Sequence, residues 1–362
     1  MEKTKNRELL PDVLRGFAIF LVVFGHCIQE GNGIEFRTNT MYFSDKVYQF
    51  IYSFHMPLFM MISGYFAWDS MERVNGTGEK WKLLGKRCAV LVMPILGWTC
   101  FEHICIWLEQ GRAYVAFWSI PLFIKYFSLR LLSNVWFLWA VFWCFLIVFF
   151  MHFYFKDSRI LYMIGFLLLF VIPDGLGLGA YKYMMPYFIA AFYYRGWQKQ
   201  ERDSVRKYLK YPQWLNNSSD WTWIGLFGIL FIGLFLLFNE NSFIYLSGYK
   251  LIGKNVVRQL GIDFYRTIIG FVGAVFFILL FRKLLRSVPN YRFPIFSALG
   301  KNSLGIYMIS GYLTIQLDNV VQGSFKPNYL LNSVQAVVII GVSFVLTLIL
   351  KKIPLLRWVV GR

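Results

Sequence analysis

The sequence predicts an all-α protein, a polytopic bundle of about ten transmembrane helices with both termini cytoplasmic. Hydrophobic residues make up 57% of the 362 residues and charged residues only 15%, which is too apolar for a soluble chain of this length. The apolar residues also fall in blocks of about 17 to 25, the length of helix that crosses a hydrocarbon core. The distribution of Lys and Arg between these blocks sets the orientation.

The apolar blocks define ten expected helices within one membrane domain that covers residues 1–362. The blocks near 160 and 180 are short and are flanked by Pro173 and Pro186, which is typical of tilted or broken helices. In chain order, the expected helices lie near residues 13–29, 47–67, 88–108, 133–155, 160–173, 180–195, 222–239, 264–281, 296–317 and 333–350.

Lys and Arg residues are unevenly divided between the two sides of this arrangement. With ten alternating helices, 26 of the 37 fall on the side of the termini and 11 on the other side. Because cytoplasmic loops carry the excess of Lys and Arg, both termini are expected in the cytoplasm, in a bacterial inner or plasma membrane. The net charge of +18 is spread between apolar blocks, so membrane lipid is expected as a partner and nucleic acid is not.

The cysteines and histidines show no metal-binding pattern. The five cysteines lie in or beside apolar segments without a CxxC pair, so neither a disulfide framework nor a zinc site is predicted. The four histidines lack the spacing of metal ligands, and no HExxH or GxSxG motif is present.

The first expected helix carries two candidate functional residues, because ionisable groups are costly within a bilayer. Arg15 and His26 are eleven residues apart, or about 1100° of helix, which returns His26 to within about 20° of the face of Arg15. The rise between them is about 16 Å. With Arg15 at the cytoplasmic boundary, His26 lies just past the midplane of a core of about 30 Å.

The second and third expected helices place further ionisable groups at a similar depth. His55 is eight residues into the second helix, about 12 Å from the outer boundary. Glu102 and His103 are about fourteen residues into the third helix, about 21 Å from the cytoplasmic boundary. Since Arg15 and Lys301 mark the cytoplasmic ends of two helices, the sequence predicts a path from the cytosol to a polar centre.

The polar residues of this path have chemical and structural interpretations. His26 can remove a proton from a hydroxyl or carry an acyl group as a nucleophile, while Arg15 and Lys301 would attract a phosphorylated donor such as a nucleotide thioester. Alternatively, His26 hydrogen-bonds a neighbouring helix and contributes only to packing. Trp136 is either an interfacial anchor or a surface on which a sugar stacks. The residues alone leave these alternatives open.

Four segments of the chain carry a resemblance to a known family. They are DVLRGFAIFLVVFGH (12–26), FHMPLFMMISGYF (54–66), VWFLWA (135–140) and LGKNSLGIYMIS (299–310). In this order they resemble the acyltransferase-3 family of integral membrane acyltransferases, and most closely its fucose-O-acetylase-like branch. The most specific feature is an Arg followed by ten residues and a His, which here are Arg15 and His26.

The resemblance implies about ten transmembrane helices and O-acylation of sugars in cell-surface glycans, usually acetylation from cytosolic acetyl-CoA. His26 matches the essential histidine of the family, and Arg15 matches a basic residue thought to serve the donor. His55 falls where the family has His or Arg before Met-Pro. Ser310 stands where many members carry His, so a second histidine is not available at that end.

We therefore expect an enzyme, an O-acyltransferase that moves acetyl from acetyl-CoA to a sugar hydroxyl of a cell-surface polysaccharide or its precursor. No bound cofactor is predicted; acetyl-CoA or another acyl-CoA is a co-substrate, and a glycan or lipid-linked glycan is the acceptor. His26 would act as general base or acyl carrier. The residues expected to carry the reaction are His26, His55 and Glu102 for catalysis, Arg15 and Lys301 for the donor, and Trp136 for the acceptor.

Two other classes of protein are compatible with the same features. Ten helices around a polar centre also suit an exporter or flippase of a glycan or lipid-linked glycan, which needs no acyl donor. A membrane scaffold subunit of a glycan-assembly complex would tolerate loss of His26. Consumption of a thioester distinguishes the enzyme from both.

Overall fold

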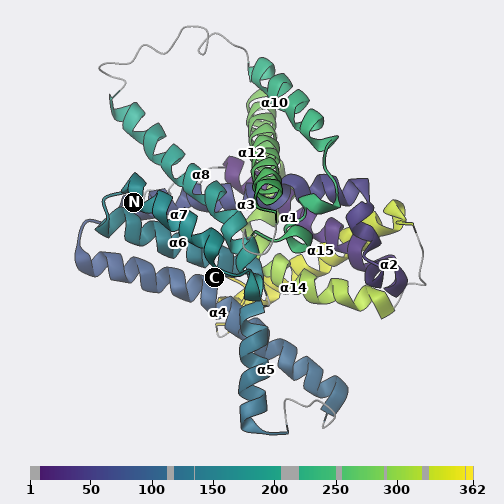
Figure 1. Cartoon of the computed structure of the whole chain (residues 1–362). Helices are drawn as coiled ribbons and strands as arrows, with labels where there is room; N and C mark the ends of the chain where they lie inside the picture. The colour runs from purple at the N-terminus through teal and green to yellow at the C-terminus, as the bar shows by residue number, and fades with distance from the viewer. Residues whose placement is uncertain are drawn as a thin grey trace.

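A computed structural model describes residues 9–111, 118–133, 135–204, 220–249, 255–288, 292–319, 326–354 and 356–361. Within these ranges the regular secondary structure is helical and no strand is present (Figure 1). In chain order the α-helices are α1 (Leu9–Glu30), α2 (Ile34–Thr38), α3 (Lys46–Met71), α4 (Thr77–Gln110), α5 (Ile120–Ser133), α6 (Trp136–Tyr154), α7 (Arg159–Val171), α8 (Leu178–Ser204), α10 (Asp220–Phe235), α11 (Ile244–Ser247), α12 (Val256–Ser287), α13 (Pro294–Lys301), α14 (Ser303–Ile315) and α15 (Tyr329–Lys352).

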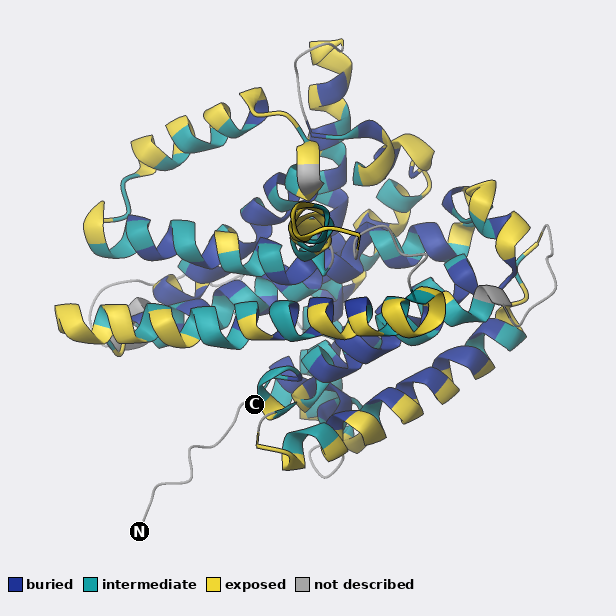
Figure 2. Ribbon diagram, turned by 90° about the horizontal axis from the view of Figure 1, so that it is seen from below, coloured by how far each residue is buried: buried dark blue, intermediate teal, exposed yellow. Residues whose placement is uncertain are grey.

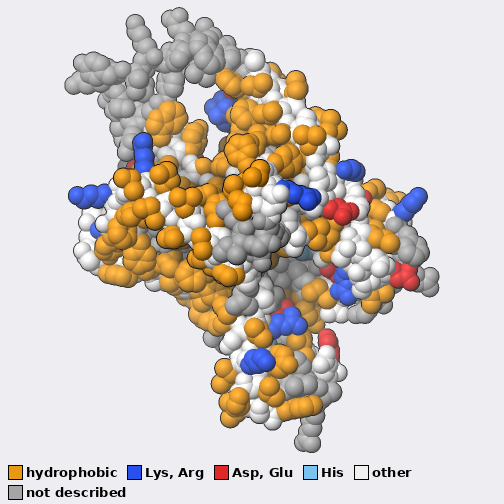
Figure 3. Space-filling view, viewed as in Figure 1, with side chains coloured by type: hydrophobic (Ala, Val, Ile, Leu, Met, Phe, Trp, Pro, Cys, Tyr) orange, Lys and Arg blue, Asp and Glu red, His pale blue; other side chains and the backbone are white. Residues whose placement is uncertain are grey.

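The protein is a multi-pass membrane protein. In the described part of the chain six helices, α1, α3, α4, α6, α12 and α15, are long and apolar enough to cross a membrane, and α7, α10 and α14 are shorter apolar helices. Figure 3 shows apolar side chains over much of the visible face, with few Lys and Arg among them. Such an apolar exterior suits a hydrocarbon environment, where every backbone hydrogen bond must be made within the protein.

Each of the ten predicted segments contains a helix, and the all-α prediction is confirmed. Several helices extend beyond the apolar blocks: α4 begins at Thr77 instead of near 88, α8 continues to Ser204, and α12 begins at Val256. The first turns of α4 are exposed and carry Glu79 and Lys80. Lys and Glu are good helix formers, so the helix continues into polar sequence that hydropathy does not detect.

The segment predicted as one helix over 296–317 is divided in two. Helix α13 ends at Lys301, and α14 begins at Ser303. Asn302 lies between them, where its side-chain Nδ2 donates a hydrogen bond to the carbonyl of Ala298 at 2.9 Å. A local side chain to backbone bond of this kind replaces a helical hydrogen bond, and the break turns the start of α14 toward the interior of the bundle.

The centre of the bundle is formed by α1 and α3. Helix α3 packs most extensively against α8 and α12, while α1 packs against α3, α13, α14 and α15. Figure 2 shows buried residues where helices meet and exposed residues on the outward faces. Aromatic rings fill one side of this core; the rings of Phe54 and Phe277, for example, stack with centroids 4.3 Å apart. A well-packed aromatic core holds the α1–α3 pair in register.

Two shorter elements lie in connections between the expected helices. Helix α5 has no buried residue and projects from the bundle, on the side opposite α10 in Figure 1. Helix α11 follows Phe243, whose ring contacts the ring of Phe43 with centroids 4.8 Å apart. The segment from 240 to 249 is therefore packed onto the bundle, whereas α5 extends from it.

Candidate active site

A close approach of two helices brings basic residues together. A Cβ atom on Gly16 of α1 would lie 1.8 Å from the carbonyl oxygen of Phe296, and one on Gly300 of α13 would lie 1.8 Å from that of Asp12. No side chain fits at either position, so glycine allows the two backbones to touch. Arg15 and Lys301 are the neighbours of these glycines, and the contact places both on the wall of one cavity.

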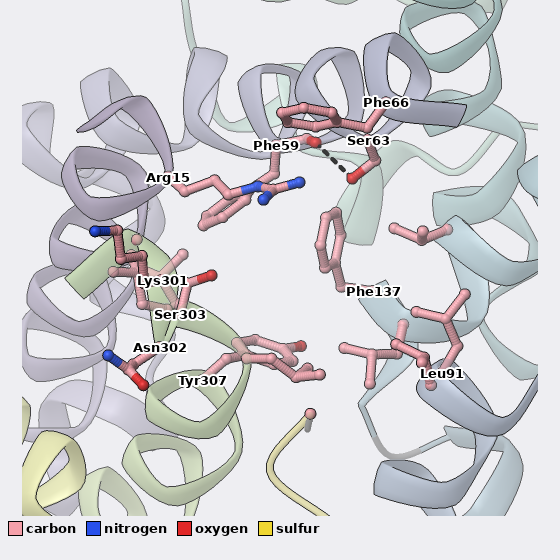
Figure 4. A pocket seen from close by; sticks show the side chains of 18 of the residues that line it. Arg15, Phe59, Ser63, Phe66, Leu91, Phe137, Lys301, Asn302, Ser303 and Tyr307 are labelled. Carbon is pink, nitrogen blue, oxygen red and sulfur yellow. Dashed lines mark hydrogen bonds between the residues drawn. The ribbon is translucent and has the colours of Figure 1, made fainter. Parts of the chain in front are cut away.

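This cavity has a volume of about 250 Å³ and is lined by residues of α1, α3, α4, α6, α8, α13 and α14, with Val360 and Gly361 near the C-terminus. We call it the cationic cavity. Figure 4 shows Arg15 and Lys301 on one side of it and Leu91 and Phe137 on the other. Segments from both ends of the chain therefore form a single internal space.

Three cations from three helices line the cationic cavity, and no Asp or Glu is among the described residues of its wall. The guanidinium of Arg15 lies 4.8 Å from the centre of the Phe66 ring. The guanidinium of Arg87 lies 5.2 Å from the Phe145 ring and donates a hydrogen bond to Ser70 Oγ at 2.6 Å. Stacking on aromatic rings holds guanidinium groups without neutralising them. The cavity wall is therefore positively charged.

The first turn of α14 adds to this charge. Asn302 and Ser303 line the cavity at the start of the helix, where backbone N–H groups lack intrahelical acceptors. The side-chain oxygen of Asn302 accepts a hydrogen bond from Lys351 Nζ at 2.9 Å, so α15 fixes this corner. Helix N-termini favour anions, and this one opens beside Lys301.

The remainder of the cationic cavity is apolar. Ile19, Val22, Met56, Phe59 and Phe137 line it, and each is an uncharged group suited to an acyl chain or another apolar arm. The cavity thus combines a cationic region with an apolar region. A ligand with phosphate at one end and an apolar group at the other would match both.

The antiparallel pairing of α1 and α3 places His26 near His55. Arg15 contacts Phe66, and eleven residues further along each helix, in opposite directions, stand His26 and His55. A Cβ atom on Gly25, next to His26, would lie 3.0 Å from Cε2 of Tyr52, one turn before His55. Eleven residues correspond to a rise of about 16 Å, so the histidine pair lies about that far from the Arg15 level. The common depth predicted for these two residues agrees with this pairing.

The two histidines lie next to the apolar region of the cationic cavity. Val22, one turn before His26, and Met56, beside His55, both line it. His55 is 2% exposed and its Nδ1 donates a hydrogen bond to the carbonyl of Ile51 at 2.7 Å. This bond assigns the proton to Nδ1 and leaves Nε2 as an acceptor. His26 is only half-buried.

A second, smaller space lies on the other side of the histidine level. It has a volume of about 20 Å³ and is lined by Tyr52, Trp136, Tyr183 and Tyr245, among others. We call it the aromatic cleft. The Tyr52 ring lies 4.7 Å from the His55 ring, and the Trp136 ring lies 6.3 Å from the Tyr245 ring. Trp136 therefore lies in a wall of aromatic rings near His55.

Glu102 and His103 do not join this group. Neither is among the described residues that line the cationic cavity or the aromatic cleft. His103 is buried, its Nδ1 donates to the carbonyl of Thr99 at 2.9 Å, and its ring contacts Phe127 of α5 with centroids 5.2 Å apart. A common depth in the membrane does not fix which way a helix face points, so the role predicted for Glu102 stays a prediction.

Sequence reasoning missed three features of the site. Arg87 falls in a basic run that indicated topology alone, Met56 was one apolar residue among many, and Asn302 and Ser303 were assigned to a continuous helix. Of these features, only the Asn302–Ser303 pair could have been recognised in the sequence, because Asn before Ser is a favourable start for a helix. The positions of Arg87 and Met56 on one cavity wall became visible only in the folded structure, where seven helices line that cavity.

The fold and the site together define a multi-pass helical membrane protein with an internal cationic cavity. A family model described as an acyltransferase domain, that of the acyltransferase-3 family, matches residues 10–352. The chain belongs to this family, and these residues form an acyltransferase domain. The match includes every residue of the cavity named above except Val360 and Gly361.

Two characterised proteins are similar to part of the chain. The nodulation protein NolL of Sinorhizobium fredii is 33% identical over 144 residues, which is 39% of this chain and 36% of the relative. The nodulation protein NolL of Mesorhizobium japonicum is 30% identical over 145 residues, 40% of this chain and 36% of the relative. The matched region thus spans about a third of each relative. No solved structure matches the chain significantly.

Proposed function

We propose that the protein is an O-acyltransferase of a bacterial cell membrane, with its termini in the cytoplasm. It transfers acetyl from acetyl-CoA to a sugar hydroxyl of a cell-surface polysaccharide or of its precursor. One observation carries the proposal: a cavity with three cations and no carboxylate in its described wall continues into an apolar region beside two histidines. Membership of an acyltransferase family supports the reaction class.

The donor would bind with its phosphates at Arg15, Arg87 and Lys301. Charge-assisted hydrogen bonds from guanidinium and ammonium groups suit phosphate oxygens, and the N-terminus of α14 adds backbone donors. A volume of about 250 Å³ is small even for a drug-sized ligand. Only the thioester arm of acetyl-CoA would therefore enter the cavity, and the nucleotide would stay at its mouth.

The thioester carbonyl would then reach the level of His26. As general base, His26 takes the proton of the sugar hydroxyl while the hydroxyl oxygen attacks the carbonyl carbon; the C–S bond breaks and the proton passes to the departing thiolate. As acyl carrier, His26 would instead attack the carbonyl carbon first and release the thiolate as the C–S bond breaks. The sugar hydroxyl would then attack the acyl-imidazole, which breaks the N–C bond, and its proton would pass to the thiolate. In either scheme the Nε2 atom of His55 is a hydrogen-bond acceptor that orients His26 or the sugar hydroxyl.

The acceptor would approach through the aromatic cleft. Sugars stack their apolar faces on aromatic rings while their hydroxyls bond to polar groups at the ring edges. Trp136 and Tyr245 offer such rings, and the cleft lies next to His55. Donor and acceptor would thus meet at the histidines from opposite sides.

The test is thiol release from acetyl-CoA by purified protein in lipid, with crude surface glycan of the source cell as acceptor. We expect His26→Ala to lower acyl transfer by about 10²-fold or more, the usual contribution of a general base. The matched control is His152→Ala, because His152 lies on α6 outside the cavity and pairs with Asp157 at 2.8 Å. It should leave transfer nearly unchanged.

Two results would contradict the proposal. Full transfer by His26→Ala would exclude this mechanism. If folded wild-type protein released no thiol from any acyl-CoA with glycan present, the enzyme would be excluded in favour of a glycan exporter or flippase.

A further inference from the structure

One side chain lies between the two spaces of the site. Met56 of α3 lines both the cationic cavity and the aromatic cleft, and among the described residues it alone lines both. Its side chain is buried, with 8% of its surface exposed. Met56 therefore lies at the boundary between the cavity of about 250 Å³ and the cleft of about 20 Å³.

The backbone at this position is firmly held. Pro57 follows Met56 inside α3, and a Cβ added to Gly270 of α12 would lie 2.9 Å from Pro57 Cγ, so α12 packs tightly against this turn. On the other side, His55 Nδ1 donates to the carbonyl of Ile51. The end of the Met56 side chain is the adjustable part, since methionine is flexible and fills irregular gaps.

We propose that Met56 sets the length of the acyl group that the enzyme accepts. The inference rests on the proposed function, which places the donor phosphates at Arg15 and Lys301 and directs the acyl end toward the apolar region. There Val22, Phe59 and Met56 face the acyl group. A two-carbon acyl group fits against Met56 at the histidine level, whereas a longer one has to displace its thioether.

The size of this discrimination follows from the packing of apolar pockets. One additional or missing methylene in a hydrophobic pocket changes kcat/KM by about 10- to 200-fold. Replacing Met56 by Ala removes three side-chain heavy atoms from the boundary and enlarges the cationic cavity toward the cleft. The added space lies where the third and fourth carbons of a butyryl group would extend.

The experiment compares kcat/KM for acetyl-CoA and butyryl-CoA in wild type, Met56→Ala, Met56→Leu and Met60→Ala, all in lipid with the same glycan acceptor. We expect Met56→Ala to raise the butyryl-to-acetyl ratio by about tenfold or more. Met56→Leu conserves volume and should keep the wild-type ratio. Met60→Ala is the matched control, because Met60 is a buried methionine one turn further along α3 that lines neither space.

A fourth variant tests the inference in the opposite direction. It also keeps the inference testable if Met56→Ala does not fold. Met56→Phe fills the boundary and should lower kcat for acetyl transfer while the KM for acetyl-CoA changes little, because the phosphate contacts are distant. An unchanged ratio in Met56→Ala, an equal rise in Met60→Ala, or normal acetyl and butyryl transfer by Met56→Phe would overturn the inference.

These outcomes are distinct from a failure of the proposed function. If wild type cleaves no acyl-CoA, the proposed function fails before any variant is compared. If wild type transfers acetyl normally and all variants keep the same butyryl-to-acetyl ratio, the reaction stands and the role of Met56 is wrong.

Discussion

Two groups of cations in this protein differ in their surroundings. In the cationic cavity, Arg15, Arg87 and Lys301 share a wall that has no carboxylate among its described residues. The cations near the aromatic cleft form direct ion pairs with carboxylates. Lys182 of α8 lies 2.9 Å from Asp174, and Arg266 of α12 forms an ion pair with Asp263.

The second group, which we call the paired network, also makes hydrogen bonds to residues 247–249. Arg266 Nη2 donates to the carbonyl of Gly248 at 2.7 Å and to Ser247 Oγ at 2.9 Å. Asp174 accepts a hydrogen bond from the backbone N–H of Tyr249 at 2.6 Å. The paired network thus fastens the segment after α11 to α8 and α12.

This difference distinguishes cations that stabilise the fold from cations that can bind a ligand. Removing ions from water is costly, and a buried ion pair offsets that cost only with good geometry and further hydrogen bonds. In the paired network the carboxylates and the acceptors of Arg266 Nη2 belong to the fold itself. The wall of the cationic cavity, which has no carboxylate among its described residues, suits an anion that enters from outside the fold. The following predictions test this division, from the largest expected effect to the smallest.

Removing one member of the paired network should affect stability most. Asp263→Ala leaves the Arg266 guanidinium, which is 1% exposed, without its carboxylate, and we expect a loss of about 3 to 5 kcal/mol in the free energy of unfolding. Chemical unfolding in detergent measures it. The double variant Asp263→Ala/Arg266→Met should recover most of this loss. A cost below about 1 kcal/mol for the single variant would contradict the structural role.

Removing a cation of the cavity should affect donor binding instead. We expect Arg15→Ala to raise the KM for acetyl-CoA by about 10- to 100-fold, since a hydrogen bond to a charged group contributes about 1.5 to 3 kcal/mol. The control is Arg37→Ala, because Arg37 pairs with Glu30 at 3.3 Å and does not line the cavity. Equal rises in KM for both variants would show that the cavity has no special role.

Separating α1 from α13 should weaken both stability and donor binding. Gly300→Ala places a Cβ at 1.8 Å from the Asp12 carbonyl oxygen, so the helices must move apart, at a cost of about 1 to 3 kcal/mol. Arg15 and Lys301 then diverge and the KM for acetyl-CoA rises. Gly311→Ala on α14 is the control, because its Cβ meets no atom within 4 Å. Thermal unfolding and KM should be measured together; normal behaviour of Gly300→Ala would refute the close contact.

Raising the salt concentration should weaken donor binding in the cationic cavity more than it weakens the paired network, and this is the smallest of the expected effects. Raising the ionic strength from about 0.03 to about 0.3 M is expected to increase the KM for acetyl-CoA several-fold, because charges at a solvent-accessible cavity mouth are screened. The stability difference between wild type and Asp263→Ala should change little, because buried pairs are screened much less. A KM independent of salt would argue against phosphate recognition by Arg15, Arg87 and Lys301.

The sequence by itself determined the helical membrane fold and the spacing of polar residues along each helix. Apolar blocks long enough to cross a bilayer leave the backbone little choice but a helix, and helical rise is fixed, so counting residues from Arg15 to His26 gives a depth. Counting residues along α3 in the same way predicted His55 at a depth similar to that of His26. Helix ends such as those of α4 and α8 were less predictable, because helices continue into polar sequence.

Only the tertiary structure decided which residues face one another. The same depth argument grouped Glu102 with His26, yet α4 presents His103 to α5 and leaves Glu102 outside the cavity wall. Arg87 and Met56 gained their positions from contacts between helices far apart in sequence. At the break between α13 and α14, the Asn302 side chain bonds to Ala298 and also to Lys351 of α15. Depth is a property of one helix, whereas the direction of a helix face is fixed by side-chain packing against its neighbours.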